Sequence, residues 1–200
     1  MRCGKVARKT RETTVEVELD LDGSGKAVIA TGLPFFDHLL SAFACHGRFD
    51  LSVQATGDIQ VDGHHMVEDV GLAMGLALTQ ALGKREGLRR WGWALLPMDE
   101  ALVQVAADLG GRSFLVYRVP VSPRSFGDFH TEMATDFWQA FSQKGGITLH
   151  VNLEYGENAH HVLEAVWKAA GVALRAAAAL DDRVSGPLST KGVLDLPAGS

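Results

Sequence analysis

The chain has 200 residues, of which 46% are hydrophobic and 22% are charged, and its formal net charge at pH 7 is −5. This composition excludes a disordered chain, and the negative charge excludes the electrostatic footprint of a nucleic-acid-binding protein. No apolar run is long enough to span a bilayer, and no apolar segment follows the basic N-terminus as in a secretory signal. We therefore expect a cytoplasmic protein without membrane or nucleic-acid partners.

Two cysteines, Cys3 and Cys45, are too few for a disulfide framework. We expect Cys3 to lie in a frayed terminus and Cys45, which stands in an apolar run, to be a small buried residue.

The first half of the chain alternates between strand and helix patterns. Residues 13–21 and 26–31, joined by a glycine-containing turn, predict a hairpin. Phenylalanine and leucine recur at helical spacing over residues 35–47, which end at a glycine. A strand over 49–55 and a helix from His64 complete this half.

A basic, glycine-punctuated connector over residues 83–90 is the most plausible seam before a second series of elements. That series is predicted to contain strands over 91–96, 101–109 and 113–119, a loop over 120–127, a helix over 130–141, a strand over 147–153 and a helix from His160 to Leu180.

An internal repeat relates the two halves. HHMVEDVGLAMGLAL begins at His64 and HHVLEAVWKAAGVAL begins at His160, and eight of the fifteen aligned positions are identical. We therefore predict an α+β protein with two pseudo-symmetric halves from an internal duplication, each a mixed β-sheet packed by two helices. The half-domains are expected at 1–86 and 87–182, followed by a tail at 183–200.

The repeated HHxxE motif is typical of a metal site. Residues three and four apart share one face of a helix, so each glutamate can join either histidine of its own copy. Adjacent histidines diverge by about 100°, which favours two different ions. Aligning the segments upstream of the repeat places Asp136 opposite His38 and adds these two as equivalents. The predicted ligands are His38, His64, His65, Glu68, Asp136, His160, His161 and Glu164, whose nitrogen and oxygen atoms suit manganese, iron or zinc.

Basic and hydroxyl side chains beside glycines form a second candidate site. Arg90, Arg112 and the tail segment Ser189-Thr190-Lys191 have the chemistry of a phosphate-monoester pocket, although an ordinary solvated loop has the same composition. Three further carboxylates, those of Glu12, Asp99 and Glu100, are candidate proton carriers that the sequence does not rank.

Eight segments in order resemble one known family, that of imidazoleglycerol-phosphate dehydratase, over roughly residues 6–194. They are FFDHLL, DGHHMVED, LRRWG, PMDEAL, DLGGRS, ITLHV, ENAHHVLEA and STKGVL. The resemblance implies a lyase of histidine biosynthesis that removes water from imidazole glycerol phosphate to give imidazole acetol phosphate. It also implies two manganese ions per active site, and trimers that build a 24-subunit shell with sites at subunit interfaces.

The resemblance also implies roles for individual residues. The eight predicted ligands match the family's metal shell, and Glu12, His65, Glu68, His161 and Glu164 are expected to be catalytic. Glu12, His38, Arg90, Arg112, Ser189, Thr190 and Lys191 are expected to contact the substrate. Two ions, one at each ring nitrogen, would stabilise an imidazolate that expels hydroxide through a diazafulvene-like intermediate. Glu12 would then move the proton.

Three features of the chain depart from the family pattern. Asp136 replaces a common histidine and favours harder ions, Ala42 replaces a usual glutamine, and DLGGRS replaces DLSGRP while keeping Arg112. Two other classes stay open: a non-catalytic metal-storage assembly and a metal-dependent hydrolase. A storage assembly would need no convergence of basic side chains.

Overall fold

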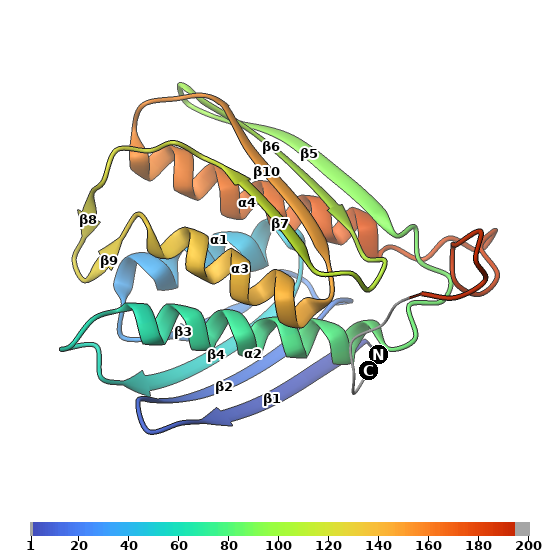
Figure 1. Ribbon diagram of the computed structural model, residues 1–200, viewed down its shortest axis with the longest axis horizontal. Helices are drawn as coiled ribbons and strands as arrows, with labels where there is room; N and C mark the ends of the chain where they lie inside the picture. Colours follow the sequence, from blue (N-terminus) through green and yellow to red (C-terminus); the bar gives the residue numbers. More distant parts are fainter. Residues whose placement is uncertain (1, 195–200) are drawn as a thin grey trace.

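The computed structural model describes residues 2–194, in which four long helices lie between two four-stranded sheets (Figure 1). The first half contains β1 (Cys3–Lys9), β2 (Thr13–Asp20), β3 (Ala27–Ala30), α1 (Pro34–Gly47), β4 (Asp50–Gly57) and α2 (His64–Leu82). The second half contains β5 (Trp91–Met98), β6 (Ala101–Asp108), β7 (Phe114–Arg118), β8 (Ser125–Phe126), β9 (Phe129–His130), α3 (Met133–Gly145), β10 (Thr148–Tyr155) and α4 (Ala159–Ala178).

The two sheets have the same topology. Their strand orders are β1-β2-β4-β3 and β5-β6-β10-β7, and in each the last pair is parallel while the others are antiparallel. The register also repeats, because Val17 lies opposite Val53 in the first sheet and Val105 lies opposite Val151 in the second. This confirms the predicted α+β fold with two similar halves. Residues 83–90 connect them.

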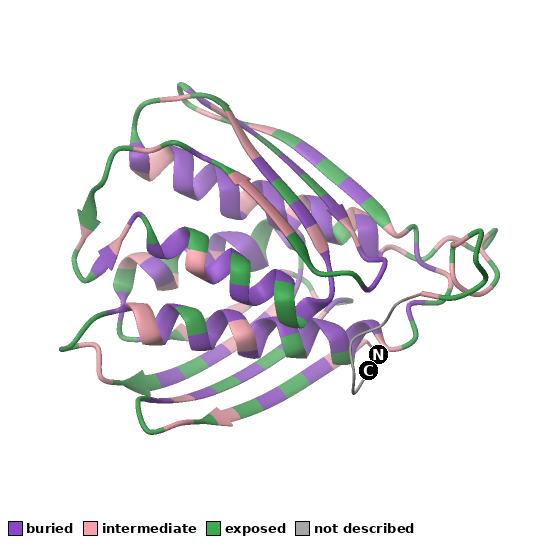
Figure 2. Cartoon of the chain, viewed as in Figure 1, coloured by how far each residue is buried: buried purple, intermediate pink, exposed green. Residues whose placement is uncertain are grey.

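The core lies where the helices pack on the sheets and on each other (Figure 2). Helices α1 and α2 cover the first sheet and α3 and α4 the second, while α2–α3 and α1–α4 contacts join the halves. A glycine shared by both copies of the repeat permits these crossings. A Cβ on Gly75 would lie 2.6 Å from the carbonyl oxygen of Phe141, and one on Gly171 would lie 2.5 Å from that of Phe43.

The predicted hairpin between residues 13–21 and 26–31 is wrong. Strand β4 lies between β2 and β3 and pairs with both, antiparallel to β2 and parallel to β3. The intervening turn is real, because the carboxylate of Asp50 accepts hydrogen bonds from the backbone amides of Ser24, Gly25 and Lys26. The actual hairpin joins β1 to β2 through residues 10–12.

Two further expectations are corrected. Cys3 begins β1 instead of lying in a frayed terminus, and Cys45 is exposed on α1. The helix predicted from His130 begins at Met133, because Phe129 and His130 pair with β8. No helix within residues 2–194 is long and apolar enough to cross a membrane.

Candidate active site

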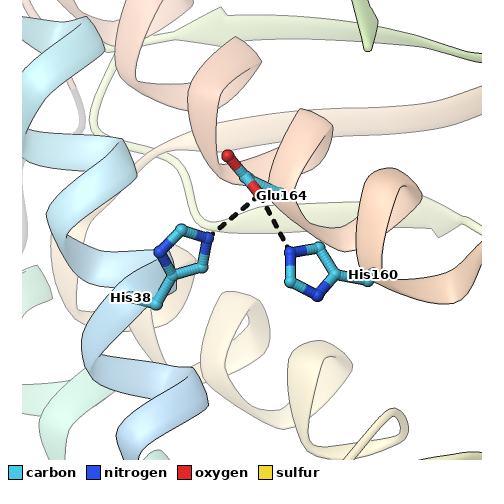
Figure 3. A group of neighbouring side chains, drawn as sticks. All are labelled: His38, His160 and Glu164. Carbon is cyan, nitrogen blue, oxygen red and sulfur yellow. Dashed lines mark hydrogen bonds and ion pairs between the residues drawn. The ribbon is translucent and has the colours of Figure 1, made fainter. Parts of the chain in front are cut away.

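Three of the predicted metal ligands converge between α1 and α4. The Nε2 atoms of His38 and His160 lie 3.0 Å and 3.1 Å from the same carboxylate oxygen of Glu164, Oε2 (Figure 3). Their ligand atoms all lie within 4.8 Å of one another, the only such group of three in residues 2–194. Two imidazole nitrogens and one carboxylate oxygen facing a common point fit a borderline divalent ion.

Helix α4 also supplies the side chain that orients Glu164. Lys168, one turn further along, donates to Oε1 of Glu164 at 2.7 Å, which leaves Oε2 for the two histidines. Burial raises the pKa of Glu164, but the hydrogen bonds from Lys168 and His38 outweigh it and lower the pKa to about 2. Glu164 is therefore an ionised carboxylate, the form that binds a cation.

A second, smaller group lies between α2 and α3. Nδ1 of His64 lies 3.1 Å from Oδ2 of Asp136. Glu68 is exposed on α2 and has no hydrogen-bond or ion-pair partner within residues 2–194. The partners are thus exchanged between the halves: His38 joins the second-half helix start, and Asp136 joins the first-half helix start.

The second histidine of the first pair faces a carboxylate-bearing loop. Nδ1 of His65 lies 3.2 Å from Asp58, and its Nε2 lies 3.9 Å from Glu12 in the β1–β2 turn. The hydrogen bond with Asp58 raises the pKa of His65 above its usual value.

His161 has a matching environment beside the β5–β6 turn. Its Nδ1 lies 2.7 Å from Glu100, and its Nε2 lies 3.5 Å from Asp99. The hydrogen bond with Glu100 raises the pKa of His161. The same bond, together with the one from the backbone amide of Asn158, lowers the pKa of Glu100 to about 2. The two histidines of each motif therefore point to different partners, as their angular separation on a helix requires.

An aromatic pocket of about 440 Å³ opens beside the three-residue group. It is lined by Pro34, Phe35, His38, Phe126, Gly127 and His160. Phe126, from the β8–β9 ribbon, stacks on Phe35 with ring centroids 4.1 Å apart. The pocket therefore offers flat apolar walls next to the ligand atoms of two histidines.

The predicted phosphate residues converge at the start of β5. One small pocket is lined by Arg90, Gly110, Arg112, Ser189, Lys191, Val193 and Leu194, and a neighbouring one of about 540 Å³ adds Thr190. Arg90 is held by a two-point hydrogen bond to Asp108, at 2.7 Å and 3.0 Å, and donates to the carbonyl of Leu188 in the tail. A Cβ on Gly110 would lie 2.6 Å from Nη2 of Arg90, so a larger residue there would displace the guanidinium.

The starts of α2 and α4, which carry the metal-type residues, lie at one end of the molecule, and the start of β5 and the C-terminal segment, which carry the phosphate-type residues, lie at the other (Figure 1). His160 is the second residue of α4, while the backbone amide of Arg90 donates to the carbonyl of Ala177 near its other end. At the rise of an α-helix, these positions are about 25 Å apart.

Sequence reasoning missed several residues around the site. Lys168 was detectable, because it follows Glu164 by four residues on a helix. Asp58 and Phe126 carry no such signal, because loop and ribbon geometry place them beside His65 and His160.

Comparison with known proteins identifies the family of the chain. The family model described as imidazoleglycerol-phosphate dehydratase matches residues 31–174. An imidazoleglycerol-phosphate dehydratase of Desulfosudis oleivorans is 52% identical over 96% of this chain and 99% of its own, and that of Syntrophobacter fumaroxidans is 53% identical over 96% and 98%. The crystal structure of the Staphylococcus aureus enzyme superimposes with a TM-score of 0.81 at 30% identity, covering 90% of this chain and 99% of its own. An IGPD structure from Pyrococcus furiosus gives 0.81 at 36% identity, covering 94% and 100%. The chain therefore belongs to the imidazoleglycerol-phosphate dehydratase family.

Proposed function

We propose that this protein is a lyase that dehydrates D-erythro-imidazole glycerol phosphate to imidazole acetol phosphate in cytoplasmic histidine biosynthesis. The observation that carries the proposal is the pocket of Arg90, Arg112, Ser189 and Lys191 in a chain that also presents the histidine and carboxylate groups. A metal-storage protein has no use for a phosphate pocket, whereas a phosphorylated imidazole needs both.

We assign the metal positions to eight side chains. Six are the histidines and glutamates of the two HHxxE motifs, and the other two are His38 and Asp136. His38, His160 and Glu164 already face a common point, and His64 faces Asp136. Manganese is our choice, because nitrogen and oxygen donors without sulfur suit it. Two ions, when bound, would supply positive charge that stabilises negative charge developing on the substrate's imidazole ring.

Glu12 is the proposed proton carrier. It lies in the β1–β2 turn, 3.9 Å from Nε2 of His65, and its side chain is 53% exposed. The hydrogen that leaves has no neighbouring carbonyl to acidify it, so a carboxylate must take it while the ring accepts the electron pair. Loss of hydroxide, combined with that proton, completes the removal of one water molecule.

The separation of the two groups supports an active site made from more than one copy of the chain. About 25 Å of helix lies between them, far more than the three-carbon chain between ring and phosphate in the substrate. We therefore propose that the phosphate pocket of one chain faces the metal ligands of a neighbour, in trimers that build a 24-subunit shell.

The test is turnover by the manganese-loaded protein. We expect imidazole acetol phosphate to form, and His65→Ala to reduce kcat by about 10³-fold or more. His150→Ala is the matched control, because His150 is exposed on β10 outside both groups, and it should keep wild-type kcat. A fully metallated wild-type protein without turnover would exclude the lyase and favour the storage assembly.

A further inference from the structure

A buried carboxylate fastens the β1–β2 hairpin to α2. Asp69, the residue after Glu68, is 5% exposed and accepts hydrogen bonds from Nε of Arg8 at 2.8 Å and from Oγ1 of Thr13. Arg8 lies in β1 and Thr13 in β2, so Asp69 holds the strands on both sides of the turn that carries Glu12. We call Asp69, Arg8 and Thr13 the hairpin latch.

The second half has the same hairpin without the latch. The strand registers place Val103 at the position of Val15, which makes Glu100 the equivalent of Glu12. The positions of the three latch residues are all apolar there, namely Leu96 for Arg8, Ala101 for Thr13 and Ala165 for Asp69. The three polar residues are thus present together in one half and absent together in the other.

The two hairpin glutamates are held in different ways. Both carboxylate oxygens of Glu100 are engaged, Oε1 by the backbone amide of Asn158 and Oε2 by His161. Within residues 2–194, no hydrogen bond engages the carboxylate of Glu12. Its backbone is fixed instead, because its carbonyl accepts from the amide of Asp58 at 3.1 Å.

We propose that Asp69 is a positioning residue for Glu12. A proton carrier must stay within reach of its substrate, yet a strong hydrogen bond to its carboxylate would oppose proton transfer. The latch satisfies both needs, because it fixes the turn beside His65 and leaves the Glu12 carboxylate without a hydrogen bond in the described residues, its nearest charged group being His65 at 3.9 Å. This inference rests on the proposed function, and it distinguishes Glu12 from Glu100 and Asp99.

The first test compares steady-state kinetics of the manganese-loaded assembly with imidazole glycerol phosphate. Asp69→Asn places an amide where two donors converge and should lower kcat about 10- to 100-fold with KM changed less than about twofold. Thr13→Val should lower kcat in the same way without touching α2, and Thr13→Ser should restore it. Glu18→Gln is the control, since it breaks the Lys5–Glu18 pair on the same hairpin away from the turn.

A double-mutant cycle separates positioning from general destabilisation. In a Glu12→Gln background, Asp69→Asn should lower kcat by less than about threefold, because the group it positions is already gone. Penalties that multiply, or a wild-type kcat for Asp69→Asn, would overturn the proposal.

Hydrogen exchange distinguishes failure of this inference from failure of the proposed function. Amides of residues 10–13 should exchange faster in Asp69→Asn than in wild type, with β5–β6 unchanged. An inactive wild-type protein with this exchange difference would refute the dehydratase and leave the latch intact as a tether. An active wild type with unchanged exchange in the variant would refute the latch.

Discussion

At the scale of single residues, the histidine pairs and their partners are not grouped within each half. His38 contacts the helix start of the second half, and Asp136 contacts that of the first. Replacing a histidine with an aspartate at this place keeps a ligand atom near His64 but adds a negative charge. Carboxylate oxygen is a harder ligand than imidazole nitrogen, so under the proposed metal assignment we expect the pair of His64 and Asp136 to favour manganese over zinc.

Substitution of Asp136 tests that preference. Asp136→His should lower the ratio of bound manganese to bound zinc after equilibration with both ions, and Asp136→Ala should weaken manganese binding about tenfold or more. Both are measured by elemental analysis after dialysis. Glu132→Ala, an exposed acidic residue one turn earlier, should bind metal as wild type does. An unchanged ratio in Asp136→His would remove the aspartate as a determinant of metal choice.

At the scale of elements, periodicity and the repeat predicted the helices and most strands well. Strand β1 was not predicted, because Val6 is its only large buried apolar residue. The turn from β1 to β2, Thr10-Arg11-Glu12, also contains no glycine or asparagine. The predicted pairing of β3 with β2 was wrong for a different reason. A turn sequence indicates that the chain reverses direction, but it does not indicate which strand will lie beside the next one. The same limit applies to the site, where motifs identified HHxxE but not the exchange of partners through helix packing.

The connector between the halves contains a structural element that its basic composition concealed. Arg85 has a φ of 57° and is 2% exposed. It donates to the carbonyls of Leu109, Gly145 and Gly146, which end β6 and α3. Burial lowers the pKa of Arg85 to about 10. A side chain of the connector thus caps a second-half helix and fixes the connector to that half.

Arg85→Met should therefore lower the free energy of unfolding by about 3 kcal/mol, because three buried carbonyls lose a charged donor. The measurement is urea denaturation at one fixed protein concentration, since assembly adds to apparent stability. Lys84→Met changes the exposed neighbour and should leave the midpoint unchanged. Equal midpoints for both variants would reduce Arg85 to an incidental buried residue.

At the scale of the whole molecule, the two sheets and the helices between them place the two chemistries far apart. The N-terminal ends of α2 and α4 carry the HHxxE motifs, and the start of β5 and the tail carry the phosphate pocket (Figure 1). The helices packed between the sheets set this separation. Under the proposed function, one chain alone would therefore offer two incomplete sites.

Mixed assemblies test whether chains complete each other's sites. His65→Ala damages the metal end and Lys191→Ala the phosphate end, so each alone should have little activity. When the two are co-assembled in equal amounts, sites that pair an intact metal end with an intact phosphate end should restore up to about a quarter of wild-type activity. Arg112→Ala with Lys191→Ala should restore none, because both residues line the same small pocket of one chain.

Hybrids verified by mass spectrometry that stay inactive in the first pairing would show that the two ends do not meet across chains. Recovery in both pairings would show that the phosphate residues come from separate chains.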